Sequence, residues 1–527
     1  MSQAAVATLP PRSKAGANKW MIASAVALGA LLELVDTSIV NVALRDMQSA
    51  LGASLSQVSW IVSSYAIANV IILPLTAWLG DRFGKKRYFV FSLFAFTASS
   101  ALCGMATSLP MLIAARVLQG LGGGGLLAKA QAILFETFPK EEQAMAQGFF
   151  SAIIIAGPVL GPTLGGTIVT NIGWRWIFFI NLPLGIVAAL MCLVYLPEDE
   201  RQAGAKARSV DWLGIALLAI GLGALQTVLE EGQSDAWFES TFIVWMSAAA
   251  VLGLALFAWR MLRAEEPVVD LRVLRHRSLW SGSILSIVVG MALYGAVFAL
   301  PLFAQGSMGL DAQQTGVLML PGALTSAVCM PLVARLNRRA DPRVLFTFGG
   351  IVLVTAVFML SHLGPTTGEG DLFWPLIIRS VGTALMILPL TLAAIGPIPK
   401  HEIGKATGIF SLTRQLGGSI GVALLTTVLE RRNAFHRAVL VEKMPLGDPQ
   451  VQERIAAFTQ NFVRHGFDLA TAKQKALALL DAIVNQQASI LSFGDTFTLT
   501  AWVILLTIPL VLLLGKPSRG VAVDAGH

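Results

Sequence analysis

The sequence predicts an all-α integral membrane protein with about fourteen transmembrane helices, and three observations lead to this class. Of the 527 residues, 55% are hydrophobic and 13% are charged, whereas soluble globular domains carry about 25% charged residues. The mean hydropathy is +0.70. Apolar runs long enough to cross about 30 Å of hydrocarbon recur along the chain, and they are continuous rather than alternating.

The predicted helices form a first group of six, an inserted pair and a last group of six. The first six cover 20–44, 59–80, 88–107, 111–134, 147–170 and 177–197. The inserted pair covers 211–229 and 241–263, and the last six cover 278–303, 315–335, 344–362, 373–396, 405–428 and 496–515.

Lys and Arg residues predict the orientation of these helices. They concentrate in the tails and in every second loop, while the short loops on the other side hold only Arg45 and Arg175. By the positive-inside rule both termini are cytoplasmic, and the net charge of +7 reflects this bias rather than a nucleic-acid surface. The predicted domains are a cytoplasmic tail (1–19), a six-helix bundle (20–197), the inserted helices with cytoplasmic linkers (198–277), a second bundle (278–515) and a cytoplasmic tail (516–527).

An internal repeat relates the two bundles. The segment PKEEQAMAQGFFSAIIIAGPVLG from Pro139 to Gly161 aligns without gaps to PKHEIGKATGIFSLTRQLGGSIG from Pro399 to Gly421. Both copies run from a cytoplasmic loop into the fifth helix of their group. We therefore expect two six-helix bundles related by a pseudo-two-fold axis normal to the membrane, with a cavity between them.

One loop is much longer than the others. Residues 430–495 form an extracytoplasmic segment far longer than the usual connection in a compact domain, with two amphipathic stretches. Two interpretations stay open: a docking surface for another protein, or an extended hairpin that lies on its own transporter.

Three of the charged residues within predicted helices are the main candidates for function. Glu33 and Asp36 are three residues apart and so share one helix face, and Arg116 in the fourth helix lies at a similar height to Asp36. A carboxylate at this depth normally faces a cavity or a partner. We predict that Asp36 and Arg116 pair and couple protons, and that Glu33, without an obvious cation, is the easier acid to protonate; the alternative is a static buried ion pair.

Other polar residues in the helices are weaker candidates. Lys129 lies near the cytoplasmic end of the fourth helix, where snorkelling to the interface is the simpler interpretation. Residues at suitable depths to line a substrate cavity are Asn41, Gln119, Gln131, Tyr294 and Arg414, although such side chains often serve packing instead. The three cysteines lie in apolar runs and the six histidines are scattered, so we expect no metal site, no cofactor and no enzyme activity.

Two glycine-containing stretches mark a loop and a helix. GDRFGKKR, Gly80 to Arg87, fills the cytoplasmic turn between the second and third helices. AGPVLGPTLGG, Ala156 to Gly166, places small residues four apart in the fifth helix, which allows close helix approach, while its prolines bend the helix.

Together with RVLQGLGGGG (Arg116 to Gly125), these stretches resemble the signature motifs of the major facilitator superfamily. The helix count and order resemble its fourteen-helix drug:proton antiporters of the EmrB/QacA type, and the resemblance covers nearly the whole chain. It implies the fold of that superfamily. LVDTSIVNVAL resembles the first-helix motif, which implies that Asp36 is the proton-linked acid with Arg116 as its partner in proton transfer.

The resemblance also implies two groups of motif residues. Cytoplasmic gating falls to Asp81, Arg82, Gly84 and Lys85. The antiporter motif, associated with export, comprises Gly157, Pro158, Gly161, Pro162, Gly165 and Gly166. The chain departs from the gating motif at Ala77, where the family usually has glycine, so a looser helix approach is expected there, and Glu33 is not part of the first-helix motif.

The long loop and the start of the last helix resemble the EmrB branch. Members of that branch pair with a periplasmic adaptor (EmrA-like) and an outer-membrane channel (TolC-like), so the resemblance implies these partners. It also implies the inner, cytoplasmic membrane of a double-membrane bacterium as the location.

We therefore predict a proton-driven multidrug efflux transporter that exports hydrophobic or amphipathic compounds across the lipid bilayer by alternating access. No GxxxxGK[ST] loop for ATP is present. One alternative is a proton-coupled exporter or importer of a specific metabolite or nutrient on the same fold. A membrane enzyme or sensor is a third class, which the scattered histidines disfavour.

Overall fold

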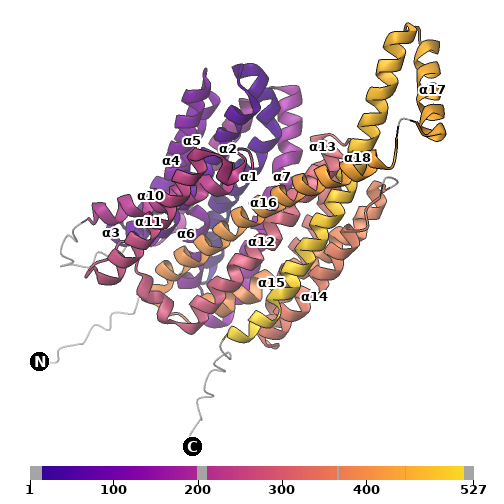
Figure 1. The fold of residues 1–527 in the computed structure, drawn as a ribbon. Helices are drawn as coiled ribbons and strands as arrows, with labels where there is room; N and C mark the ends of the chain where they lie inside the picture. Colours follow the sequence, from indigo (N-terminus) through magenta and orange to yellow (C-terminus); the bar gives the residue numbers. More distant parts are fainter. Residues whose placement is uncertain (1–14, 199–209, 365–366, 446, 515–527) are drawn as a thin grey trace, which may run out of the picture.

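The structure is a computed structural model that describes residues 15–198, 210–364, 367–445 and 447–514, and within these ranges all regular structure is helical (Figure 1). By length and composition, 13 helices in the described ranges can cross a membrane. One more, α12 (Arg277–Gly306), has 30 residues and contains the apolar stretch Arg277–Ala292. With α12 included, the fourteen predicted spans all correspond to helices.

The first six spans are partly built from broken helices. They are α1 (Ala15–Leu51), α2 (Leu55–Ile72) continued by η1 (Leu73–Leu75) and α3 (Thr76–Phe83), α4 (Lys85–Gly104), α5 (Leu109–Gly123) continued by α6 (Leu126–Thr137), α7 (Lys140–Asn171), and α8 (Trp176–Phe179) continued by α9 (Asn181–Tyr195).

The inserted pair is α10 (Trp212–Glu231) and α11 (Thr241–Arg263), joined through η2 (Trp237–Glu239) and followed by η3 (Leu271–Arg275). The two helices touch backbone to backbone, since a Cβ added at Gly221 would lie 2.8 Å from the Leu254 nitrogen. Asp211 caps α10 and pairs with Arg260 of α11 at 2.8 Å, and this contact holds the pKa of the Asp211 carboxyl below its ordinary value.

The last group begins with α12 and continues with α13 (Ala312–Asn337), α14 (Pro342–Leu360), α15 (Glu369–Ile395), η4 (Lys400–Glu402), α16 (Ile403–Glu442), α17 (Pro449–Arg464), α18 (Leu469–Thr507) and η5 (Pro509–Leu513). The described chain begins and ends at one end of the helical body, which we call the terminal face. The hairpin of α16, α17 and α18 projects from the opposite end, which we call the hairpin face (Figure 1).

Helices α16 and α18 differ from the expected spans. Instead of ending near 428 and starting near 496, α16 runs to Glu442 and α18 starts at Leu469. Their polar ends pair with each other, as Arg437 donates to Asp481 and to Asn485 at 2.8 Å each. The apolar run marks where a helix enters the membrane, and it does not mark where the helix ends.

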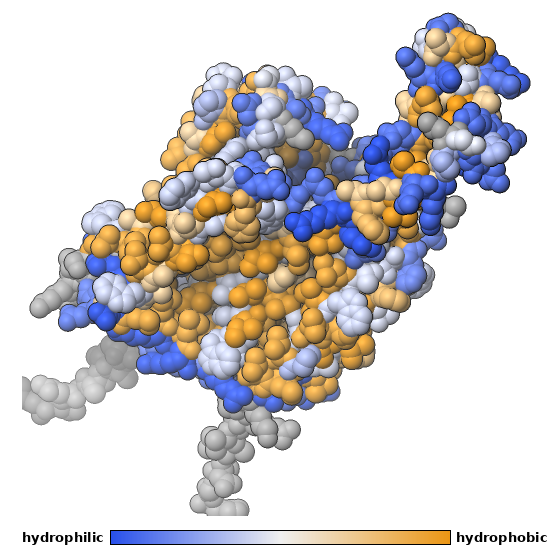
Figure 2. Space-filling model, in the orientation of Figure 1, coloured by the Kyte–Doolittle hydropathy of each residue, from blue (hydrophilic) through white to orange (hydrophobic). Residues whose placement is uncertain are grey.

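The surface agrees with a multi-pass membrane protein. Figure 2 shows a broad apolar band across the visible side of the helical body, with hydrophilic residues along the terminal face and over much of the projecting hairpin. Helix α7 packs against both α1 and α13, and the halves also meet where α16 contacts η1, α3 and α6. The two halves therefore meet along α7 and where α16 crosses the second and fourth spans.

Candidate functional site

Asp36 and Arg116 form a fully buried ion pair. Arg116 Nη1 lies 2.6 Å from Asp36 Oδ2, and the two side chains are 1% and 0% exposed. Asp36 comes from α1 and Arg116 from α5, so the heights estimated from the rise per residue predicted this contact correctly. Whether the pair carries protons stays a prediction.

Two amides complete the shell around Asp36. Asp36 Oδ1 accepts hydrogen bonds from Gln119 Nε2 at 3.0 Å and from Asn181 Nδ2 at 2.7 Å. Asn181 also donates to Ser100 Oγ at 3.0 Å, and Ser100 donates to the Phe178 carbonyl at 2.9 Å. The carboxylate is therefore held by residues of three helices, α5, α9 and, through Ser100, α4.

Arg116 is itself held on several sides. Its Nε donates to the Ile61 carbonyl at 3.0 Å, and its Nη1 also donates to Gln119 Oε1 at 2.9 Å. The guanidinium lies 4.2 Å from the centre of the Tyr65 ring. Because the planar guanidinium offers donors in fixed directions and a flat face, it can make all these contacts at once.

Glu33 occupies a second polar site nearer the terminal face. Its Oε1 accepts from Asn69 Nδ2 at 2.7 Å and its Oε2 accepts from the Leu127 backbone N–H at 3.0 Å. That N–H belongs to the first turn of α6, which exists because the preceding glycines break the fourth span. Gly125 has φ +85°, a conformation that glycine adopts at little cost. Glu33 thus sits at the positive end of a half-helix.

Tyr65 lies between the two acidic sites. Its ring stacks on Arg116, which holds Asp36, and one turn further along α2 is Asn69, which holds Glu33. The Tyr65 side chain is 2% exposed, and its hydroxyl has no hydrogen-bond partner of ordinary geometry. The two acids therefore belong to one buried polar region.

Lys129 does not snorkel, so that interpretation was wrong. Its side chain is 6% exposed, its ammonium donates to the Thr76 carbonyl at 3.1 Å and lies 4.7 Å from the centre of the Tyr88 ring. The space it fills is the one that a Cβ at Gly80 would occupy, since that atom would lie 1.7 Å from Lys129 Nζ. The sequence-based interpretation failed because it placed Lys129 by depth without its neighbours.

The residues predicted to line a cavity lie in different surroundings. Asn41 is exposed and donates to the Thr37 carbonyl, Gln119 is buried in the Asp36 network, and Gln131 is buried against Gln147 of α7. Arg414 is half-buried over the Phe410 ring at 5.7 Å. The Tyr294 side chain lies outside the described residues. Substrate contact at these positions stays a prediction.

The gating residues lie in the turn between α3 and α4. Asp81 and Arg82 are exposed, Gly84 has φ +92°, and Lys85 pairs with Glu136 of α6 at 2.7 Å. This turn lies at the terminal face, beside the contact between the halves.

Ala77 is 8% exposed and faces α16. A Cβ added at Gly404 would lie 3.7 Å from the Ala77 Cβ, and one added at Gly408 would lie 3.4 Å from the Leu73 carbonyl oxygen. Both are ordinary van der Waals distances, so α16 lies beside Ala77 without a close backbone approach that requires glycine.

The antiporter-motif residues lie in α7, which stays one continuous helix through Pro158 and Pro162. Its glycines face α1: a Cβ at Gly157 would lie 2.8 Å from the Leu34 Cβ, and one at Gly165 would lie 2.8 Å from Ile39 Cγ1. Gly166 is buried as well. This stretch thus presses against the part of α1 that carries Glu33 and Asp36.

The internal repeat carries a matching pair of contacts at the terminal face. Glu142, in the first copy, pairs with Lys19 at the start of the first span. Glu402, at the same place in the second copy, pairs with Arg275 at 2.8 Å and His276 at 2.6 Å, just before α12 begins. The shared Pro-Lys-x-Glu frame was a signal from which this correspondence could have been inferred.

No group of three or more His, Cys, Asp or Glu residues within the described ranges could hold a metal ion. The buried polar region contains two carboxylates, one guanidinium, amides, hydroxyls, peptide groups and the Cys103 thiol, which donates to Gln119 Oε1 at 3.5 Å. The carboxylates can hold and exchange protons, and the amides and hydroxyls can change partners.

Comparisons with known proteins agree with one another. A family model described as Major Facilitator Superfamily matches residues 26–422. The chain is 31% identical over 513 residues to the Multidrug export protein EmrB of Escherichia coli (strain K12), over 97% of this chain and 98% of that protein. It is 29% identical over 507 residues to the Fatty acid resistance protein FarB of Neisseria gonorrhoeae, over 96% and 98%.

A solved structure shares the fold. The proton:xylose symporter XylE matches with a TM-score of 0.59 at 14% sequence identity, over 95% of this chain and 100% of that chain. At this identity the likeness concerns the arrangement of the helices and not the substrate.

Proposed function

The chain belongs to the major facilitator superfamily, and from this premise we propose that it is a proton-driven exporter of hydrophobic or amphipathic compounds. The similarity to multidrug export proteins over nearly the whole length supports export of such compounds. The observation that carries the proton-coupled part is the buried Asp36–Arg116 pair, 2.6 Å apart, with two amides on the carboxylate.

Asp36 is the switch of the proposed cycle. When it takes a proton, Arg116 becomes a buried cation without its counter-charge, and a group of that kind costs several kcal/mol in a low-dielectric interior (~3–5 kcal/mol for a broken buried pair). The cost is relieved if the helices that carry the two residues rearrange. Protonation of Asp36 is thereby tied to a change of conformation.

Glu33 has a different role in the proposed cycle. Its partners are the Asn69 amide and the Leu127 N–H, which carry no formal charge. A proton on Glu33 leaves no unpaired cation behind, so this site holds a proton without forcing a rearrangement. The two acids then act as a holding site and a switch along one helix face.

The orientation follows the positive-inside rule, with the terminal face cytoplasmic and the chain in the inner membrane. Protons entering from the hairpin face favour the inward-facing state, and substrate binding with proton release on the cytoplasmic side drives the return. Each proton supplies about 2.3 kcal/mol per 100 mV of membrane potential, in addition to the pH difference.

The projecting hairpin is the proposed docking surface for a periplasmic adaptor, which would link the exporter to an outer-membrane channel. Figure 1 shows this hairpin standing clear of the helical body rather than lying on it. It exposes several large apolar side chains, among them Phe435, Val441, Val463, Phe467 and Leu469.

The test uses purified protein in liposomes that contain a pH dye, with an imposed proton gradient and a panel of lipophilic cations, lipophilic weak acids and uncharged drugs. Substrate-evoked proton flux should fall at least tenfold in Asp36→Asn and less steeply in Glu33→Gln. Asp46→Asn, an exposed acid on the same helix, is the matched control and should keep full flux.

Two results would contradict the proposal. Full flux in Asp36→Asn would make the buried pair purely structural. Proton flux in which substrate and protons move in the same direction would establish the alternative, proton-coupled uptake of a metabolite.

A further inference from the structure

The inserted helix α10 carries polar residues at its hairpin-face end that the proposed transport cycle does not use. Gln226 is 0% exposed and Glu231 is 3% exposed. Glu230 lies between them in sequence and accepts a hydrogen bond from Gln226 at 2.8 Å. Buried polar side chains in a membrane helix are costly and need partners, so their partners show what this helix is attached to.

On one side α10 is bonded to α2 of the first bundle. Ser63 Oγ donates to Glu231 Oε1 at 2.6 Å, and Ser59 Oγ lies 3.4 Å from Glu231 Oε2. Further along, the contact includes apolar side chains of α2, since a Cβ added at Gly223 would meet the tip of the Ile71 side chain at 3.4 Å and that of Ile67 at 3.7 Å. Side-chain tips of this kind can slide over a neighbouring helix, whereas a hydrogen bond breaks within about 1 Å of displacement.

On the other side α10 and the turn after it are bonded to α16 of the second bundle, at three places. Gln226 Nε2 donates to Ser419 Oγ at 2.8 Å, and Trp237 Nε1 donates to Thr427 Oγ1 at 3.1 Å. Gln233 donates to Glu430. These three contacts span Ser419 to Glu430, about three turns of α16.

A cavity of about 210 Å³ lies beside this contact, between the last turn of α10 and α16. Its lining includes Glu230 and Gln233 from the α10 side and Val422 and Thr426 from α16. This space adjoins the hydrogen bonds from Gln226 and Gln233 to α16, so these bonds rather than continuous close packing join the end of α10 to α16.

Alternating access requires that the halves of α2 and α16 near the hairpin face change their separation. Helix α10 is hydrogen-bonded to both of them here, so one set of bonds must break. We propose that α10 travels with α16, and that Glu231 is a positioning residue whose bonds to α2 hold the two bundles in the present conformation and are released when they rock.

This inference rests on the proposed function, because it assumes that the two bundles rock. Helix α10 packs along more of α2 than of α16, but its hydrogen bonds to α2 all go through one carboxylate, Glu231, with two serines of α2, whereas three separate hydrogen bonds tie α10 and the turn after it to α16. The inserted pair, α10 and α11, then moves with the second bundle and limits the movement between the two bundles.

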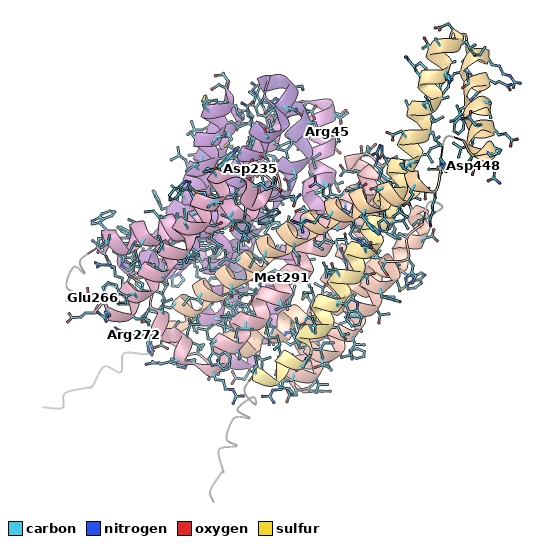
Figure 3. All side chains as sticks on the ribbon, in the orientation of Figure 1. Arg45, Asp235, Glu266, Arg272, Met291 and Asp448 are labelled. Atoms are coloured by element: carbon cyan, nitrogen blue, oxygen red, sulfur yellow. The ribbon has the colours of Figure 1, made fainter. Side chains whose placement is uncertain are left out.

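The experiment measures distances between spin labels by double electron–electron resonance in the full-length protein. Labels go on three exposed positions that leave Glu231 intact: Ser56 of α2, Asp235 after α10 and Arg431 of α16. Figure 3 labels Asp235, at the hairpin-face end of α10. Native cysteines Cys103, Cys192 and Cys329 are replaced by alanine.

Each pair of labels is compared between the parent protein and Asp36→Asn, which mimics the protonated switch. The Ser56–Arg431 pair reports the rocking itself. The inference predicts that the Ser56–Asp235 distance changes with it by several Å, while the Asp235–Arg431 distance stays within 2 Å, about one helical residue step.

The opposite pattern, with Asp235 fixed to Ser56 and moving from Arg431, would overturn the inference and leave the proposed function intact. An unchanged Ser56–Arg431 distance would show that Asp36→Asn does not make the bundles rock, which would contradict both the proposed transport cycle and the movement of α10 with α16. Movement of Asp235 from both reporters would also overturn it.

A second variant tests Glu231 directly. In the protein that keeps Asp36, Glu231→Ala should raise the ratio of the rocked to the present conformation at least tenfold, as read from the Ser56–Arg431 distance distribution. The reason is that hydrogen bonds to a charged group are lost. Glu231→Gln keeps an acceptor for Ser63 and should raise this ratio less. Glu230→Gln, which leaves the α2 contact untouched, is the matched control; an equal shift in all three variants would mean that Glu231 has no positioning role.

Discussion

Arg116 shows how much one side chain can hold together. It contacts the Asp36 carboxylate, the Gln119 amide, the Ile61 carbonyl and the Tyr65 ring, all inside the first bundle. A single charge could satisfy Asp36. The other contacts need the planar guanidinium, which has donors on separate nitrogens and a flat face.

We therefore expect that Arg116→Lys does not preserve function. Lysine keeps the charge but cannot reach both Asp36 and the Ile61 carbonyl while lying on the Tyr65 ring. Substrate-evoked proton flux should fall more than tenfold, and the free energy of unfolding should drop by about 1–3 kcal/mol for the lost hydrogen bonds. Both are measured on the purified protein, by dye-loaded liposomes and by thermal unfolding in detergent.

Arg45→Lys is the matched control. Arg45 lies on α1 at the hairpin face and is exposed, so its replacement should change neither quantity (Figure 3). Wild-type flux in Arg116→Lys would show that only the charge at this position matters.

The residue scale also shows what a single sequence can predict about a site. The sequence predicts the Asp36–Arg116 pair because charged residues are rare in membrane helices and these two lie at similar heights in the membrane. It does not predict Asn181 as a partner, since an asparagine near a helix end has many ordinary roles, and only the packing of α9 against α1 brings it to 2.7 Å from Asp36.

Among the elements, α7 depends most closely on its glycines. A Cβ at Gly161 would lie 1.9 Å from the Ser38 hydroxyl oxygen and 2.9 Å from the Ile39 backbone nitrogen. A hydroxyl can rotate away, but the backbone of α1 cannot. The two helices must therefore separate if this position gains a side chain.

Gly161→Ala should consequently destabilise the protein by about 1–3 kcal/mol, the usual cost of overpacking. Gly370→Ala in α15 is the control, because nothing lies within 4 Å of a Cβ there, and alanine should be neutral or slightly stabilising. The measurement is the midpoint of thermal unfolding in detergent. Equal midpoints for both variants would show that α1 and α7 are not tightly packed in solution.

At the same scale, apolar runs predicted the number and order of the spans but not their breaks. The fourth span reads as one run, yet Gly124 and Gly125 divide it into α5 and α6 and so create the helix end that binds Glu33. Glycines in α7 leave that helix unbroken. Whether a glycine breaks a helix or lets another helix approach depends on the neighbour it meets.

For the whole molecule, the projecting hairpin is separable from the helical body. Helix α17 packs on α18 and has one buried residue, Ile455. Replacing 449–464 by a short glycine–serine linker should therefore leave the thermal midpoint within about 2 °C and the liposome flux unchanged, because few buried contacts are lost.

The same deletion should abolish binding of a periplasmic adaptor if the hairpin is its docking surface. Co-purification with and without residues 449–464 checks this. A loss of flux in liposomes, where no adaptor is present, would instead assign the hairpin a part in transport itself.

The sequence by itself determined the class of protein, the number and order of the spans, the internal repeat and the two acids. Charge and unpaired backbone groups are costly in hydrocarbon, so a span must be a long apolar helix, and a charged residue within it stands out in the sequence. Only the tertiary structure decided which neighbours each polar group has. In the tertiary structure Lys129 is buried over the Tyr88 ring, the N-terminus of α6 binds Glu33, and α10 is hydrogen-bonded to both bundles. The physical reason is that partnership depends on which helix faces meet, and residues far apart in the chain set those faces.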